Sequence, residues 1–188
     1  MFDMLLAVKR DNEIQVGLSV RDSLVDMTER DVSLLENIPF WKVKGVKDCY
    51  VFAEDLTYAV DLLKHSDYVF KNLTDAQSII DSIIPKMKDL LAKHLRLLNG
   101  KEWDSQLLIV KDGKMYSIDH FFTVMEESQF VAFNYVGYLL GGLEEFDENS
   151  PIDAILFATR KLKEIKNVNM FPLVTFNTKT KKVKTYYN

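Results

Sequence analysis

The chain has 188 residues, of which 47% are hydrophobic and 28% charged, and its formal net charge is −4 at pH 7. This length and balance are typical of a globular protein with one well-buried core, so we expect a single domain over residues 1–188. The net negative charge argues against a dedicated nucleic-acid binder, because no excess of cations is available to replace phosphate counterions. A lone cysteine, Cys49, excludes an intramolecular disulfide and favours a cytoplasmic location.

Neither membrane nor cofactor signals are found in the sequence. The first ten residues lack the basic region and the small-residue cleavage site of a signal peptide. The longest apolar runs, of about five residues, are far shorter than the roughly 20 that a membrane-spanning helix needs. No nucleotide-binding glycine motif, Cys-x-x-Cys, His-Glu-x-x-His or Gly-x-Ser-x-Gly pattern occurs, so we predict no cofactor and no metal site.

The first half of the chain begins with strands and changes to helices. Two short apolar runs, Met4–Val8 and Ile14–Leu18, predict a β-hairpin around Asp11-Asn12. A second pair of strands is predicted at Trp41–Val46 and Cys49–Ala53, with its turn at Lys47-Asp48, whereas residues 20–39 give no clear pattern. From residue 54 to about residue 69 the apolar residues recur at helical spacing and predict a helix.

A second helix is predicted to start at a capping box, Thr74-Asp75-Ala76-Gln77, in which Thr74 is the N-cap and Gln77 its partner. Asn99-Gly100 is expected to end it. Pro85 lies inside the pattern, so we expect a kink there. The predicted buried face consists of Ile80, Ile83, Ile84, Met87, Leu90, Leu91, His94, Leu95 and Leu98.

Strand spacing then returns. Leu107–Val110 and Lys114–Ile118 flank Asp112-Gly113, and Asp-Gly is among the best short hairpin signals. Further strands are predicted at Phe121–Met125 and Phe130–Phe133. A helix over residues 135–146 contains Gly137 and Gly141, which we interpret as positions of close backbone packing.

The last third contains the clearest helix start in the chain. Ser150 is predicted as the N-cap, Pro151 as the first helical residue and Asp153 as the acid three residues after the cap. The helix is expected to run to about Lys166 and to bury Ile152, Ile155, Leu156, Thr159, Leu162 and Ile165. Leu173–Phe176 and Val183–Tyr186 predict a final hairpin.

This order of elements, with strand pairs alternating with helix pairs, indicates an α+β domain. Its opening hairpin, the stretch Phe40–Lys44, the hairpin within 107–116 and Val131–Tyr135 resemble the proteasome β-subunit and HslV family of N-terminal nucleophile hydrolases. The resemblance covers nearly the whole chain, from about Asp3 to Val183. It implies a four-layer αββα sandwich, in which two antiparallel sheets lie between helix pairs.

The resemblance also implies where catalysis would take place. In the family a threonine begins the mature chain, and its hydroxyl attacks while its own amine serves as the base. That position falls on Asp3, which is preceded by Met1-Phe2 and is no hydroxyl or thiol. The family lysine corresponds to Lys42, and the family acid corresponds to Ser19, with Asp22 nearby. Around Asn134 no counterpart of the family serine is found, so we expect no catalytic residues and only a vestigial pocket of Asp3, Ser19 and Lys42.

Three hypotheses follow. The first is a degenerate proteasome-like subunit that acts by forming a homo-oligomer or by binding a protein partner. The alternative is a hydrolase with a relocated site around Ser19, Asp22 and Lys42. A third interpretation is an unrelated α+β domain with the same order of elements. The substrate, the partner and the stoichiometry stay open.

Other polar groups are interpreted as structural. Asp119-His120 could be a catalytic dyad, but a polar pair in a loop is the simpler interpretation, and Cys49 fits a small core residue. His94 is assigned to a helix face, His65 to an exposed turn, and Glu144–Glu148 to a solvated helix end. Lysines near the C-terminus could form a phosphate patch, although protection of an edge strand is the preferred interpretation; these are Lys179, Lys181, Lys182 and Lys184.

Overall fold

The structure, a computed structural model, describes residues 2–20, 40–53, 67–93, 106–133, 150–166 and 170–187. The chain divides into two compact units. Unit 1 consists of Met1–Ile38 and Gln129–Asn188, and unit 2 consists of Pro39–Ser128. The expectation of a single domain over residues 1–188 stays a prediction.

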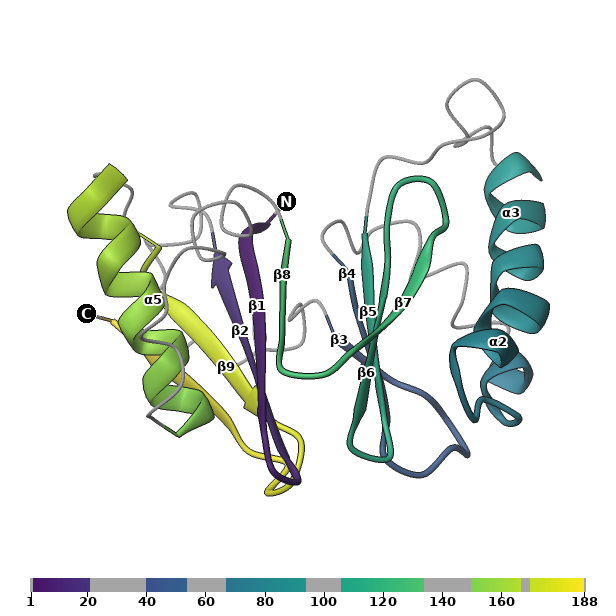
Figure 1. Ribbon diagram of the computed structural model, residues 1–188, viewed down its shortest axis with the longest axis horizontal. Helices are drawn as coiled ribbons and strands as arrows, with labels where there is room; N and C mark the ends of the chain where they lie inside the picture. The colour runs from purple at the N-terminus through teal and green to yellow at the C-terminus, as the bar shows by residue number, and fades with distance from the viewer. Residues whose placement is uncertain are drawn as a thin grey trace, which may run out of the picture. The chain divides into compact units, whose positions relative to one another are not determined.

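Unit 1 contains a five-stranded antiparallel sheet, here called sheet 1, with the strand order β10-β9-β2-β1-β8. A helix, α5 (Pro151–Lys166), runs along one face of this sheet (Figure 1). The strands are β1 (Phe2–Arg10), β2 (Glu13–Val20), β8 (Phe130–Phe133), β9 (Leu173–Asn177) and β10 (Val183–Tyr186).

Both predicted hairpins of unit 1 are confirmed. Arg10 pairs with Glu13, so Asp11-Asn12 is a two-residue turn, and Asp11 has a φ of 50°. Aspartate tolerates this left-handed conformation better than most residues, which explains its place in the turn. The C-terminal hairpin connects β9 to β10, and β10 lies at the edge of sheet 1.

The start of α5 is also confirmed. The Ser150 hydroxyl donates to the Asp153 carboxylate at 2.5 Å, and the Asp153 amide donates to the Ser150 hydroxyl at 3.4 Å. The predicted stripe is correct at Ile155, Thr159 and Leu162, which are buried. It is wrong at Ile165, which is 62% exposed because it lies in the last turn, next to the end of the helix.

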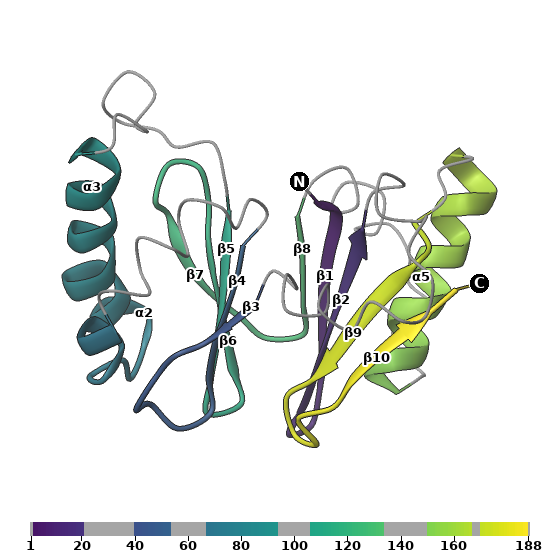
Figure 2. The same cartoon turned by 180° about the vertical axis from the view of Figure 1, so that it is seen from behind.

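Unit 2 contains a second five-stranded antiparallel sheet, sheet 2, with the order β3-β4-β5-β6-β7. Helical segments cover one face of it (Figure 2). The strands are β3 (Phe40–Lys42), β4 (Cys49–Ala53), β5 (Leu107–Lys111), β6 (Lys114–Ile118) and β7 (Val124–Glu127). The helical segments are η3 (Asp67–Phe70), α2 (Ala76–Ser78), the π-helical turn η4 (Ile79–Ile83) and α3 (Ile84–Lys93).

Sheet 2 confirms the Asp112-Gly113 hairpin and corrects two strand boundaries. Asp112 and Gly113 have φ angles of 49° and 76°. The strand predicted at Trp41–Val46 ends at Lys42, because the chain turns through Gly45 with a φ of 73°. The strand predicted from Phe121 begins at Val124.

The late start of β7 has a local cause. Asp119 closes a turn, since its carboxylate oxygen Oδ1 accepts hydrogen bonds from the amides of Phe121 and Thr123 at 2.9 and 2.8 Å. Within this turn Phe122 has a φ of 65°, a conformation that no strand residue adopts. The aspartate side chain therefore competes successfully with strand pairing.

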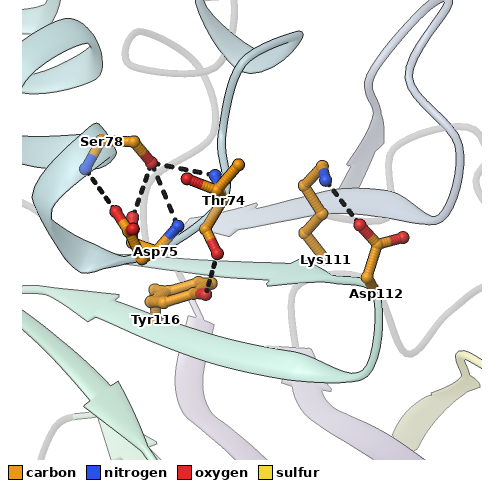
Figure 3. Close-up of polar contacts among 6 residues, drawn as sticks. All are labelled: Thr74, Asp75, Ser78, Lys111, Asp112 and Tyr116. Carbon is orange, nitrogen blue, oxygen red and sulfur yellow. Dashed lines mark hydrogen bonds and ion pairs between the residues drawn. The ribbon is translucent and has the colours of Figure 1, made fainter.

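The N-cap of the unit 2 helix is Asp75, not Thr74 as predicted. The Ser78 amide donates to Asp75 Oδ1 at 2.8 Å, and the Asp75 amide donates to the Ser78 hydroxyl at 3.2 Å (Figure 3). The Tyr116 hydroxyl donates to the Thr74 carbonyl at 3.4 Å. Gln77, the predicted cap partner, donates instead to Asp81 at 2.9 Å.

At Pro85, where a kink is expected, the structure has a π-helical turn in the segment just before it. The Ile84 amide donates to the Ile79 carbonyl, five residues back, and the following Pro85 has no amide hydrogen to donate. This turn changes which side chains face the core. Ile83, Ile84, Met87 and Leu91 are buried as predicted, whereas Ile80 is 44% exposed, contrary to the prediction.

The α+β class with two antiparallel sheets is therefore confirmed. Several predicted features lie outside the described residues: the first helix up to residue 66, the end of the second helix beyond residue 93, and the helix over 135–146 with Gly137 and Gly141.

Candidate functional site

The start of β1 is the position to which the resemblance assigns the nucleophile. Phe2 pairs with Val20 and Met4 with Ser19, and the register shifts between these two pairs. Asp3 is therefore the additional residue of a β-bulge, opposite the end of β2. Bulges are over-represented next to active sites because they redirect a side chain and interrupt strand pairing. Sheet pairing thus brings Asp3 and Ser19 to the same end of the hairpin.

Ser19 is buried, with only 2% of its surface exposed. Side chains alternate along a strand, so Ser19 is on the same face of sheet 1 as Gly17. That face packs against α5, because a Cβ atom at Gly17 would lie 2.7 Å from Cγ2 of Ile155. A serine in this environment is not accessible to a peptide chain.

Lys42 is the last residue of β3 in unit 2, where it pairs with Tyr50, and its side chain is exposed. The predicted meeting of Lys42 with Asp3 and Ser19 stays a prediction. Asp22 and Asn134 lie outside the described residues, as do His65, His94 and Glu144–Glu148.

The possible dyad Asp119-His120 forms part of the turn that precedes β7. Oδ1 of Asp119 accepts the two backbone amides described above. His120 Nε2 lies 3.0 Å from the side-chain nitrogen Nε2 of Gln106. Because an amide nitrogen only donates, the ring nitrogen is the acceptor in this contact. These contacts are those of a structural turn, as the sequence interpretation expected.

Cys49 is fully buried in β4, and burial raises the pKa of its thiol to about 12. A thiol with this pKa carries almost no thiolate at neutral pH, and the thiolate is the nucleophilic form. The interpretation of Cys49 as a core residue is therefore confirmed by its burial.

The lysines near the C-terminus lie on and beside an edge strand. Lys184 belongs to β10, and its ammonium lies 4.7 Å from the centre of the Tyr186 ring. Lys179 and Lys182 are exposed in the connecting turn. Charged side chains at a sheet edge oppose pairing with another chain, and this placement supports the edge-protection interpretation.

Unit 2 contains a basic depression that sequence reasoning did not single out. Its volume is about 340 Å³, and its lining includes three lysines and one aspartate: Lys47, Lys71, Lys111 and Asp112. These residues come from the turn after β3, the segment after η3 and the end of β5. No short motif could have indicated this cluster, because only the fold brings its members together.

Two kinds of site are absent from the part of the chain that the structure describes. It contains no group of three or more His, Cys, Asp or Glu side chains that could hold a metal ion. It also contains no helix with the length and apolar character needed to cross a membrane.

Comparison with solved structures gives the class of fold. The chain is similar to BPH of Thiobacillus denitrificans, with 16% identity and a TM-score of 0.65, over 93% of this chain and 96% of that one. BPH in complex with epoxomicin gives 17% identity and a TM-score of 0.64, over 93% and 97%. HslV from Trypanosoma brucei gives 11% identity and a TM-score of 0.55, over 93% and 98%.

The chain therefore has a proteasome/HslV-like fold. No family model matches the sequence, and no curated protein matches it. At these identities the likeness concerns the fold alone.

Proposed function

We propose that this chain is a proteasome/HslV-like protein without N-terminal-nucleophile peptidase activity, which acts by assembling with copies of itself or with a protein partner. The observation that carries the proposal is Asp3. It stands where the resemblance requires a hydroxyl or thiol, at a bulge near the start of β1. A carboxylate cannot attack a peptide bond in the way that an N-terminal threonine does.

The burial of Ser19 also supports the proposal. A relocated site around Ser19, Asp22 and Lys42 would need a serine that a substrate can reach, and Ser19 is 2% exposed. Lys42 is then a remnant of the family pattern. It is exposed on β3, so its ammonium does not neutralise a buried carboxylate.

Assembly is supported by β7, which is an edge strand of sheet 2 among the described strands. The edge strand β7 carries Met125, which is 54% exposed, and the preceding turn carries Phe121, which is 65% exposed. Large apolar side chains at the edge of a sheet favour association. The cytoplasmic location and the identity of the partner stay predictions.

The test of lost activity uses fluorogenic peptides and epoxomicin, the compound that BPH binds in one of the similar structures. We expect no cleavage above a buffer blank, and intact-mass spectrometry should find no adduct after incubation with epoxomicin. Loss of an essential catalytic group can reduce a rate by up to about 10⁶-fold, which is below detection for such substrates.

Variants of the same chain identify the source of any cleavage. Cleavage that Ser19→Ala or Lys42→Ala abolishes would establish the relocated hydrolase and overturn the proposal. Cleavage that both variants retain would indicate a contaminating peptidase. Native mass spectrometry of the wild type and of Met125→Lys tests assembly separately. A monomer at all concentrations, without a partner, would contradict that part of the proposal.

A further inference from the structure

The basic depression of unit 2 is lined by residues of backbone turns and is open to solvent. Gly45 and Val46 complete its lining. Gly45 has a φ of 73°, and a Cβ atom built on it would meet no other atom within 4 Å. The Asp112 amide donates to the Asp48 carbonyl at 3.3 Å, which ties the turn between β5 and β6 to the turn after β3. Two of the segments that line the depression are thus connected through the backbone.

Its three ammonium groups are in different environments. Only 14% of the Lys111 side chain is exposed, and its ammonium is paired with the Asp112 carboxylate at 2.5 Å (Figure 3). Lys47 and Lys71 are exposed, and neither has an ion-pair partner among the residues that the structure describes. Like charges that share one depression repel each other, so a bound anion would relieve that repulsion.

The charge of the lining determines the kind of anion. Three lysines and one aspartate give a net charge of +2. A phosphate group carries between about −1.5 and −2 at neutral pH and offers three acceptor oxygens. Each ammonium has three N–H donors, so Lys111 can hold Asp112 and still donate to a ligand. Charge-assisted bonds to phosphate are stronger than neutral ones.

We propose that the depression formed by Lys47, Lys71 and Lys111 binds a phosphate group, either as inorganic phosphate or as a phosphate monoester. Its volume of about 340 Å³ exceeds that of a single phosphate ion, which leaves room for the remainder of a small ester. Lys47 and Lys71 supply the charge that the ligand neutralises, and Lys111, held by Asp112, is the third lysine of the lining.

Isothermal titration calorimetry on the full chain, at pH 7.5 and low ionic strength, tests the proposal with inorganic phosphate and with glycerol 2-phosphate. We expect saturable binding of one ligand per chain, competition by sulfate, and weaker binding as salt is added. The double variant Lys47→Ala, Lys71→Ala should weaken binding roughly tenfold, because each exposed charge contributes a modest share.

Lys44→Ala is the matched control, because Lys44 is an exposed lysine of the same turn that does not line the depression. It should leave the affinity unchanged. Thermal unfolding of each variant without ligand establishes that the variants fold, which is expected because Lys47 and Lys71 are exposed. Tighter binding of glycerol 2-phosphate would assign the site to esters, and equal or weaker binding would assign it to the free ion.

Three results would overturn the proposal. The first is no saturable heat with either ligand, and the second is binding that the double variant leaves unchanged. The third is an equal loss in Lys44→Ala, which would mean that general surface charge attracts the anion.

Discussion

The helices of the two units pack on their sheets in different ways. In unit 1, α5 approaches sheet 1 so closely that a glycine, Gly17, is required beneath Ile155. In unit 2, the helical segments rest on sheet 2 through large side chains, including Phe70, Ile83 and Met87, all at most 2% exposed. The contact of α5 with sheet 1 depends on the absence of a side chain at Gly17. The contact of the unit 2 helices with sheet 2 depends on large side chains that fill the space between them.

The two kinds of packing differ in how far a hydrophobic pattern in the sequence can predict them. The large side chains of unit 2 produce a strong apolar pattern, but the π-helical turn changes which of them are buried. The unit 1 helix follows regular spacing from a strong N-cap, yet its closest contact involves a residue with no side chain, which no hydrophobic pattern reveals. We therefore expect unit 2 to be sensitive to the removal of side-chain volume and unit 1 to be sensitive to its addition.

The largest effect is expected from Ile83→Ala in η4. Ile83 is fully buried in the core of unit 2, so removing its side chain leaves a cavity and should cost about 2–5 kcal/mol in the free energy of unfolding. Urea denaturation followed by circular dichroism measures it.

The matched control is Ile80→Ala, in the same π-helical turn, where Ile80 is 44% exposed. An exposed substitution of this kind is expected to change the stability by no more than about 0.5 kcal/mol. Equal losses of stability for the two variants would mean that Ile80 is buried like Ile83. The regular buried face that the sequence predicts would then be correct.

A smaller loss is expected from Gly17→Ala in β2. The added methyl would lie 2.7 Å from Cγ2 of Ile155, an atom next to the helix backbone that cannot easily move. Overpacking of this kind costs about 1–3 kcal/mol. The loss should be smaller in an Ile155→Leu background, because leucine has no atom at that position, and a double-mutant cycle measures the coupling. Additive losses would show that the two residues do not compete for the same space.

Much of the fold could be predicted because turns and caps have local causes. Asp11, Asp112 and Gly113 adopt left-handed conformations that few other residues accept, and Ser150-Pro151 starts a helix by its own chemistry. The boundary errors have local causes too, at the Asp119 turn before β7 and at Gly45 after β3, whereas the N-cap error lies beside a distant group. The Tyr116 hydroxyl donates to the Thr74 carbonyl, and the N-cap is the next residue, Asp75.

The candidate site could be predicted only in part, for the same reason. Asp3 and Ser19 were found together because they belong to one hairpin, whose register follows from its turn. The bulge at Asp3 has no signature in the sequence. The lysines of the basic depression come from segments as far apart as Lys47 and Lys111, and only the pairing of β4 with β5 brings them close.

The smallest effect is expected from the pH dependence of the helix cap in unit 2. The hydrogen bond from the Ser78 amide lowers the pKa of Asp75 below its ordinary value of 3.8. A lowered pKa means that the folded state binds the proton less readily than the unfolded state does. The stabilisation is therefore fully present above the unfolded pKa and is lost as the pH falls through the folded one.

Asp75→Asn keeps a good N-cap but cannot titrate, so its melting temperature should fall less than that of the wild type between neutral pH and the acid range. Differential scanning calorimetry of the two proteins measures this difference, which is small because the carboxylate is exposed to solvent and salt. Parallel melting curves at every pH would show that the cap contributes no charge-dependent stability, and the contrast between the two helices would then rest on packing alone.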